Sequence, residues 1–341
     1  MQLKTFGQKP GGKRLQKILN SPNYRDGSFQ NLSVTEVMLK GASKTKMLGD
    51  FFRKPKDTTP LHELPSVKTN LHTLQHDAPV IVWFGHSSYF IKHNNFTVLV
   101  DPVFSGYASP VNFFGKAFKG TDIYTADDMP HIDMCIITHD HYDHLDYKTI
   151  LQLKDKTTTF YTSLGVGSHL EYWGIDAEKI KEFDWWDTIV VTNDIKLTAL
   201  PARHFSGRGF KRGETLWSSF ALQLFGYNIY IGADSGYDTH FKTIGEKYGP
   251  FDIAILECGQ YGANWPYIHM TPEQTVTAAI DLKAKALLPV HHSKFALAMH
   301  PWNEPLKRVV AAAENNITIA TPIIGKPVII NKHYPSLQWW V

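Results

Sequence analysis

Four side chains that can bind a metal fall within six residues of this chain, and this cluster constrains the fold more than any other feature. The segment HDHYDH follows an apolar, strand-like run and precedes a stretch with helical spacing; its ligand types are His139, His141, Asp143 and His144. Imidazole nitrogens with a carboxylate oxygen suit a borderline cation such as Zn²⁺, with Fe or Mn as alternatives. A polar loop with unrelated histidines does not account for four ligands at this spacing. The segment therefore predicts a metal site on a turn at the end of a strand.

Three later strand-like runs end in the same residue types. His204 follows one apolar run, Asp234 ends another, and the pair His291 and His292 follows a third. Each signal is weak alone, because a histidine at a strand end is more often structural. Together they favour a site with two ions, and Asp234 is the natural bridging carboxylate.

Short β-rich runs alternate with helical stretches from about residue 79 onward. A turn at 93–95 separates two of these runs, and Thr271, Pro272 and Gln274 carry the capping signature of a helix start. The strands fall into two groups with helices between them. This pattern predicts an α/β (α+β) fold, an αββα sandwich of two mainly antiparallel or mixed β-sheets flanked by helices. Residues 1–76 are interpreted as an N-terminal arm packed on a main domain of 77–341.

Composition narrows the functional classes. The net charge of +3 is too small a bias to indicate nucleic acid as a partner. The two cysteines are interpreted as reduced core residues, and the first residues have charge but no apolar signal region. The sequence thus predicts a cytoplasmic protein and leaves its oligomeric state open. The 17 histidines again favour metal binding.

Further motifs carry a resemblance to a known family. The chain resembles the metallo-β-lactamase superfamily over about residues 79–330. Within it, the chain is similar to the branch of the N-acyl-phosphatidylethanolamine phospholipases D and, more distantly, to the L-ascorbate-6-phosphate lactonases. The motifs are WFGHSS at 83–88, DPVF at 101–104, GADSGY at 232–237, HMTPEQ at 269–274 and HHSKFAL at 291–297.

The resemblance implies a ligand set for two divalent metal ions. His139, His141 and His204 would hold the first ion, Asp143, His144 and His291 the second, and Asp234 would bridge them. His291 is preferred to His292 as the ligand because an aromatic residue of the branch falls at position 292; His292 is assigned to substrate binding instead.

The expected reaction is hydrolysis by a metal-bound hydroxide, since paired cations lower the pKa of water and polarise a phosphoryl or carbonyl oxygen. The first hypothesis is a phosphodiesterase of phospholipase D type that acts on an N-acylated phospholipid or a related phosphodiester, so the expected partner is a lipid or small molecule that carries a phosphate group. The second is a lactonase or another ester or amide hydrolase with a small anionic substrate. The third is a metal-binding scaffold without activity. Asp143, Asp234 and His269 are the expected catalytic residues.

Supporting roles follow for a few more residues. Asp101 and His86 are expected behind the ligands, holding the metal-binding loop, although a turn Asp and a packed His are the alternatives. His269 and Arg208 are expected to bind the substrate phosphate. Leu48, Phe51 and Phe52, beside three cations at 53–56, leave open peripheral membrane contact or a packed turn.

Overall fold

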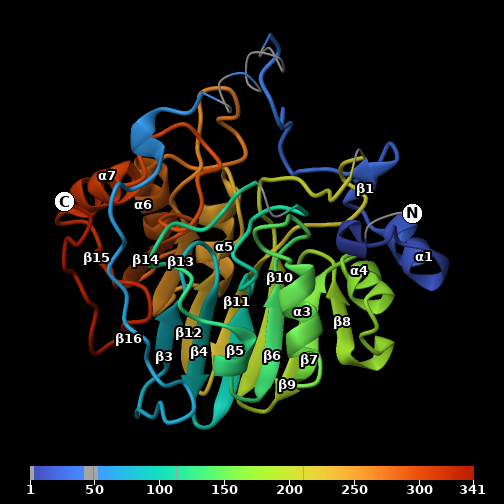
Figure 1. Ribbon diagram of the computed structural model, residues 1–341. Helices are drawn as coiled ribbons and strands as arrows, with labels where there is room; N and C mark the ends of the chain where they lie inside the picture. The colour runs from blue at the N-terminus through green and yellow to red at the C-terminus, as the bar shows by residue number, and fades with distance from the viewer. Residues whose placement is uncertain (1–3, 42–48, 50–52, 112–113, 210) are drawn as a thin grey trace.

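The computed structural model describes residues 4–41, 49, 53–111, 114–209 and 211–341. Two seven-stranded sheets form its centre (Figure 1). The first sheet has the order β16-β3-β4-β5-β6-β7-β8, and the second has the order β15-β14-β13-β12-β11-β10-β9. The strands of the first sheet are β3 (Val80–Trp83), β4 (Tyr89–His93), β5 (Phe96–Val100), β6 (Ile132–Ile137), β7 (Thr157–Ser163), β8 (Ile180–Phe183) and β16 (Pro327–Ile329). Those of the second are β9 (Thr188–Thr192), β10 (Ile195–Leu200), β11 (Ser219–Leu224), β12 (Tyr227–Ile231), β13 (Ile253–Glu257), β14 (Ala286–Val290) and β15 (Thr318–Ile319).

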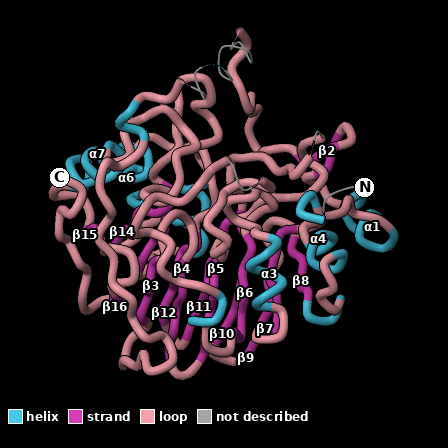
Figure 2. The backbone as a smooth tube through the Cα atoms, in the orientation of Figure 1, coloured by secondary structure: helices cyan, strands magenta, loops and turns pink. Residues whose placement is uncertain are grey.

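Helices cover the outer faces of the two sheets. They are α3 (Tyr147–Leu153), α4 (Gly167–Tyr172), α5 (His240–Tyr248), α6 (Pro272–Asp281) and α7 (Glu304–Ala313), with short 3-10 turns η1 (Lys4–Phe6), η2 (Lys56–Thr58), η3 (Ala126–Asp128) and η4 (Ala177–Lys179). Figure 2 shows these helices outside the strands, with α3 in front of the first sheet. Among the described residues, none of the helices combines the length and apolarity needed to cross a membrane.

Alternate side chains of each strand enter different cores. In β13, Ile253 and Ile255 face the layer between the sheets, whereas Ala254 and Leu256 pack under α5, α6 and α7. A third core lies between the first sheet and α3 and α4. Because strands buried on both faces need apolar residues at every position, this arrangement explains the continuous apolar runs. The αββα sandwich expected from the sequence is confirmed.

Local signals in the sequence are also confirmed. Asn94 and Asn95 have positive φ angles in the tight turn between β4 and β5, a conformation in which Asn is favoured. Thr271 and Gln274 form the reciprocal hydrogen bonds of a capping box at the start of α6.

Strand direction brings several strand ends to one edge. In the first sheet β3, β5 and β6 run in the same direction, because β4 is antiparallel to β3 and β5, and β5 is parallel to β6. In the second sheet β10, β12, β13 and β14 share a direction for the same reason. The loops that follow these seven strands supply the site.

The segment 4–41 packs on the sandwich, and we call it the N-terminal arm from here on. It contains α1 (Gly12–Asn20) and a small hairpin of β1 (Tyr24–Arg25) and β2 (Ser28–Phe29). Ile18 and Phe29 enter a buried cluster with Leu164 and Trp217. In Figure 1 the arm runs from α1 past the hairpin and along the end of the sheets at which the ligand loops lie. Leu48, Phe51 and Phe52 lie outside the described residues.

Candidate metal centre

The ends of the seven co-directional strands supply the polar side chains of one site. These residues are His86 after β3, Asp101 after β5, His139, His141, Asp143 and His144 after β6, His204 after β10, Asp234 after β12, Glu257 at the end of β13, and His291 after β14. Most of them are buried, although each is polar. Buried polar groups need partners, so a concentration of this kind indicates a common ligand.

A first cluster combines three imidazoles with one carboxylate. His141 Nδ1 lies 3.0 Å from His139 Nε2 and 3.2 Å from His204 Nε2. Asp234 Oδ2 lies 3.8 Å from His139 Nε2 and 3.7 Å from His204 Nε2. Ligands placed about 2.0–2.1 Å from one tetrahedral cation lie roughly 3.3 Å apart. These four atoms could therefore hold a single ion.

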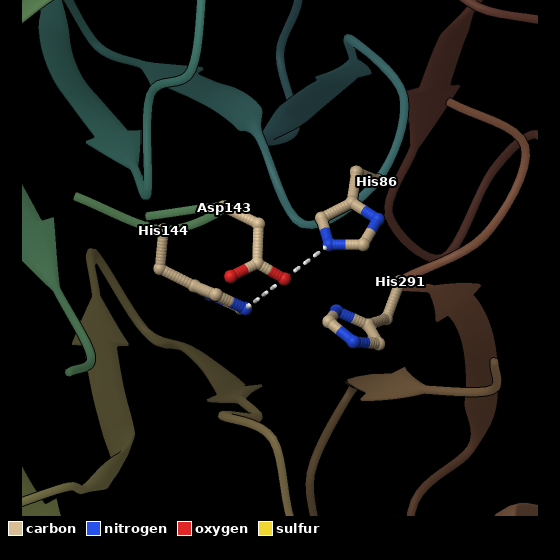
Figure 3. Close-up of side chains that lie close together, drawn as sticks. All are labelled: His86, Asp143, His144 and His291. Carbon is tan, nitrogen blue, oxygen red and sulfur yellow. Dashed lines mark hydrogen bonds and ion pairs between the residues drawn. The ribbon is translucent and has the colours of Figure 1, made fainter. Parts of the chain in front are cut away.

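A second cluster lies beside the first and consists of His86, Asp143, His144 and His291 (Figure 3). His86 Nε2 lies 2.9 Å from Asp143 Oδ2, and His144 Nε2 lies 3.7 Å from the same oxygen. The structure thus places His86 in contact with Asp143, where it can hold that carboxylate in position or bind an ion itself.

Asp234 lies between the two clusters. Its Oδ2 faces the first, whereas its Oδ1 lies 3.2 Å from His144 Nε2 and 3.1 Å from His291 Nδ1. Despite these short distances, Asp234 Oδ1 and His144 Nε2 are buried atoms that form no hydrogen bond with any described residue. Buried polar atoms without a partner are costly. A divalent cation bound between them would satisfy both atoms, so these residues fit a metal ion.

Asp101 holds the metal-binding loop from behind. Its carboxylate accepts hydrogen bonds from Thr138 N (2.8 Å) and Thr138 Oγ1 (2.7 Å), and His144 Nδ1 lies 2.8 Å from Oδ2. The contact fixes the His144 ring so that Nε2 points toward Asp234. The backbones of Asp101, His86 and His291 have φ values of 41°, 52° and 65°. Such strain in residues other than glycine concentrates at functional sites.

Burial and charge act differently on the individual histidines. Burial lowers the pKa values of His139, His204 and His291 well below the ordinary range, so these rings are neutral at pH 7 and can donate a lone pair. Burial also opposes charge on His144, but the nearby carboxylates, Asp234 foremost, outweigh it and raise the pKa of that ring.

A further acidic residue, Glu257, belongs to the site and is absent from the set predicted from the sequence. It is 1% exposed, and its Oε2 lies 3.0 Å from His269 Nδ1 while Oε1 accepts a hydrogen bond from Met270 N (2.5 Å). Burial raises the pKa of Glu257, and the Glu257 carboxylate outweighs the effect of burial on His269 and raises the pKa of that ring. The His269 ring lies 5.1 Å from that of His204 and 5.2 Å from that of His291. One feature of the sequence could have identified Glu257: it is a charged residue at the end of an apolar strand. Asp234 lies just beyond the end of such a strand.

Arg208 does not face the site, contrary to its expected role in substrate binding. The residue is 4% exposed, and its guanidinium donates hydrogen bonds to the carbonyl oxygens of Thr5, Asp140 and Leu145. It also lies over the ring of Tyr142, 4.1 Å from the centroid. Arg208 therefore ties the metal-binding loop to the N-terminal arm, and four of its five N–H donors are occupied.

His292 also differs from its expected role. Its Nδ1 lies 2.9 Å from Ser293 Oγ and its Nε2 lies 3.1 Å from the carbonyl of Pro289. The ring packs against Trp83, 4.9 Å between centroids, and burial lowers its pKa to about 3. Both ring nitrogens have partners, so His292 has no free group for a substrate; the structure brings His291 into the cluster instead.

A pocket of about 260 Å³ opens over both clusters. Its polar wall includes His269 and Arg212, whose guanidinium lies 4.6 Å from the centroid of the Phe205 ring and has no ion pair or hydrogen bond with the described residues. The remaining wall is largely apolar and is formed by Val37, Met38, Phe205, Trp265, Ile268 and Leu297. A larger cavity of about 770 Å³ opens beside Arg208 and includes no side chain of either cluster.

Comparison with known proteins agrees with the fold and the site. A model of the beta-lactamase superfamily domain matches residues 97–292. An uncharacterised protein of Mycobacterium tuberculosis is 36% identical over 326 residues, which cover 94% of this chain and 87% of that protein. The N-acyl-phosphatidylethanolamine-hydrolysing phospholipase D 1 of Caenorhabditis elegans is 26% identical over 249 residues, which cover 68% of this chain and 70% of that protein. A solved metallo hydrolase of the archaeon Ignicoccus hospitalis has the same fold, with a TM-score of 0.57 and 20% identity over 74% of this chain and 97% of that one.

The family model spans more than half of the chain and includes the strand ends from β5 to β14 that carry every member of the two clusters except His86. The resemblance seen in the sequence motifs is thereby confirmed. The chain belongs to the metallo-β-lactamase superfamily and is one of its metal-dependent hydrolases.

Proposed function

We propose that this chain is a phosphodiesterase of phospholipase D type, which hydrolyses an N-acylated phospholipid or a related phosphodiester at a centre with two divalent cations. One observation carries the proposal: the two carboxylate oxygens of Asp234 face two separate groups of ligands. Paired cations of this kind are typical of enzymes that displace a group from phosphorus. A single-ion site would need neither the second cluster nor a shared carboxylate.

The proposed ligands follow the two clusters. His139, His141 and His204 would hold one ion, Asp143, His144 and His291 the other, and Asp234 would contact both. Zn²⁺ suits these ligands, with Fe and Mn as alternatives. When bound, such cations supply Lewis acidity, which polarises a phosphoryl oxygen and makes water more acidic.

Residues of the pocket would recognise the substrate and carry the proton. The guanidinium of Arg212 would bind a non-bridging phosphate oxygen, since it lies against the Phe205 ring and pairs with no carboxylate of the described ranges. His269 Nδ1 donates to Glu257, which leaves Nε2 directed away from Glu257 to give a proton to the departing alcohol oxygen as the phosphorus–oxygen bond breaks. The products would be a phosphate monoester and a free alcohol.

The apolar wall supports an acylated substrate. Val37, Met38, Trp265 and Leu297 surround the polar centre, and such a wall favours an alkyl chain next to the phosphate. The relative from C. elegans is named for hydrolysis of N-acyl-phosphatidylethanolamine, which supports this class of substrate.

A small anionic substrate, such as a phosphorylated lactone, is the second candidate. The pocket volume of about 260 Å³ favours it, because a whole phospholipid is larger than this space. Under the first proposal only the headgroup and the adjoining bonds enter the pocket, and the diacyl part stays outside.

The test compares both substrate classes on one preparation of the chain loaded with Zn²⁺. We expect N-acyl-phosphatidylethanolamine in mixed micelles to yield phosphatidate and N-acylethanolamine, with ¹⁸O from labelled water in the phosphatidate. Activity should disappear with a chelator and return with added metal. Exclusive turnover of lactones, or release of diacylglycerol instead of phosphatidate, would contradict the proposal. The Arg212→Met variant should raise KM for charged diesters more than it lowers kcat.

A further inference from the structure

The N-terminal arm reaches one of the ligand loops directly. His204 follows β10 after a short irregular stretch, so its peptide groups have no strand beside them. Asn31 of the arm fills that place: its Oδ1 accepts a hydrogen bond from His204 N (3.0 Å), and its Nδ2 donates one to His204 O (2.8 Å). Buried backbone groups outside regular structure need such side-chain partners. The Asn31 side chain therefore supplies the acceptor and the donor that a neighbouring strand would otherwise offer to the His204 backbone.

The chemistry of an amide suits this position uniquely well. One side of the Asn31 side chain must accept, because it meets the His204 N–H and the Trp217 indole Nε1 at 3.2 Å. The other side must donate, because it meets a carbonyl. Only a primary amide offers both functions at this length; an Asp would present an acceptor to the carbonyl oxygen.

Two restraints together aim the His204 ring. Asn31 fixes the backbone, and the His204 Nδ1–H donates to the carbonyl of Ile268 at 2.9 Å. The remaining nitrogen, Nε2, is thereby directed at His141 and Asp234. Partners that orient a ligand in this way tune the affinity of a metal site.

The adjoining part of the arm extends the same restraint. The Nε of Arg203 donates to Thr35 Oγ1 (2.9 Å), and its Nη2 donates to the carbonyl of Val34 (3.1 Å). The next residues of the arm, Val37 and Met38, line the pocket itself. The arm is thus continuous from the ligand backbone to the pocket wall.

We infer that Asn31 is a positioning residue for the first cluster: through His204 it sets the affinity of the ion held by His139, His141 and His204. The inference rests on the proposed function in so far as that function places an ion there. It predicts a selective effect, because none of the hydrogen bonds of the Asn31 side chain reaches Asp143, His144 or His291.

The test is a Co²⁺ titration of the metal-free full chain, followed by the visible absorption of the bound ion. Asn31→Asp, which is isosteric, and Asn31→Ala should each weaken one of the two binding steps by about 10–100-fold and leave the other within about twofold. Asn23→Ala is the matched control: Asn23 Nδ2 also joins the arm to the main domain, by a hydrogen bond to Asp184 Oδ1 (2.7 Å), but does not touch a ligand. Its two binding steps should equal those of the wild type.

The possible outcomes separate this inference from the proposed function. Normal binding of two ions by Asn31→Asp and Asn31→Ala would overturn the role of Asn31 and leave the proposed function standing. Equal loss of both steps, with a similar loss in Asn23→Ala, would also overturn it, since the effect would then come from general undocking of the arm. A wild-type chain that binds one ion would overturn the two-ion proposal, while the affinity of that ion in Asn31→Asp would still decide the role of Asn31. A wild-type chain that binds no ion would overturn both.

Discussion

Replacing Arg208 with Met should destabilise the chain and leave substrate affinity unchanged. Met keeps most of the apolar stem and removes every donor. The guanidinium donates from Nη1 to the carbonyls of Asp140 (2.8 Å) and Leu145 (2.7 Å), and from Nε and Nη2 to that of Thr5 (3.1 and 2.7 Å). All three carbonyls lose this donor in the variant.

The magnitude follows from the two contacts that are buried. A buried carbonyl left without its donor costs about 1–3 kcal/mol. Two of them give roughly 2–6 kcal/mol, and relief from burying the guanidinium of Arg208 offsets part of this, so we expect a loss of about 2–4 kcal/mol. At about 1.4 °C per kcal/mol for a chain of this size, Tm should fall by roughly 3–6 °C.

The assay combines thermal unfolding with steady-state kinetics, and Arg212→Met serves as the matched control. Arg212 is exposed and lies at the pocket, so its variant should keep the wild-type Tm and raise KM for an anionic substrate. Arg208→Met should show the reverse pattern. An unchanged Tm together with a raised KM in Arg208→Met would refute the reasoning and restore Arg208 as a substrate-binding residue.

Three further results are expected. Glu257→Gln should lower kcat by about 10–100-fold and move the alkaline limb of the pH–rate profile to lower pH. The Glu257 carboxylate raises the pKa of His269, so without it the His269 ring loses its proton at lower pH. An unchanged limb would exclude His269 as the proton donor. Gly259→Ala should weaken metal binding in a titration, since a Cβ at 259 would clash with the carbonyl of His291; binding equal to that of the wild type would show that the loop can shift without cost. The ion held by His139, His141 and His204 should stay bound after dialysis at pH 6 as at pH 8, because burial lowers the pKa values of these three rings and a proton competes for their nitrogens only at lower pH; loss of all bound metal by pH 6 would contradict this sign.

The sequence predicted those parts of the site that follow from strand ends. An apolar run determines a strand, and a polar residue directly after it is placed at a sheet edge; His139, Asp234 and His291 could be predicted in this way. Their convergence depends on strand direction, which pattern alone does not give and the family resemblance supplied. Glu257 obeys the same rule, but it lies within the apolar run IAILEC at 253–258 and not directly after it.

The side chains around the site were harder to predict, because their roles depend on rotamers and on distant partners. Arg208 and Arg212 lie in one basic segment and look equivalent in the sequence. One is buried against three carbonyls, whereas the other is exposed beside Phe205. His291 and His292 are adjacent and lie on opposite sides of the backbone, so a shift of one residue changes a cluster member into a core residue.

The N-terminal arm has a consequence for how the chain acquires its site. Asn31 forms hydrogen bonds with His204, which lies 173 residues further along the chain. Thr5 accepts hydrogen bonds from Arg208, which lies 203 residues further along. The first sheet depends on a pairing of still longer sequence separation, because Val82 of β3 lies opposite Pro327 of β16. The sandwich and the docked arm therefore both need distant parts of the chain to meet. The geometry of the first cluster is thus a property of the described chain as a whole, and not of the family-matched residues 97–292 alone.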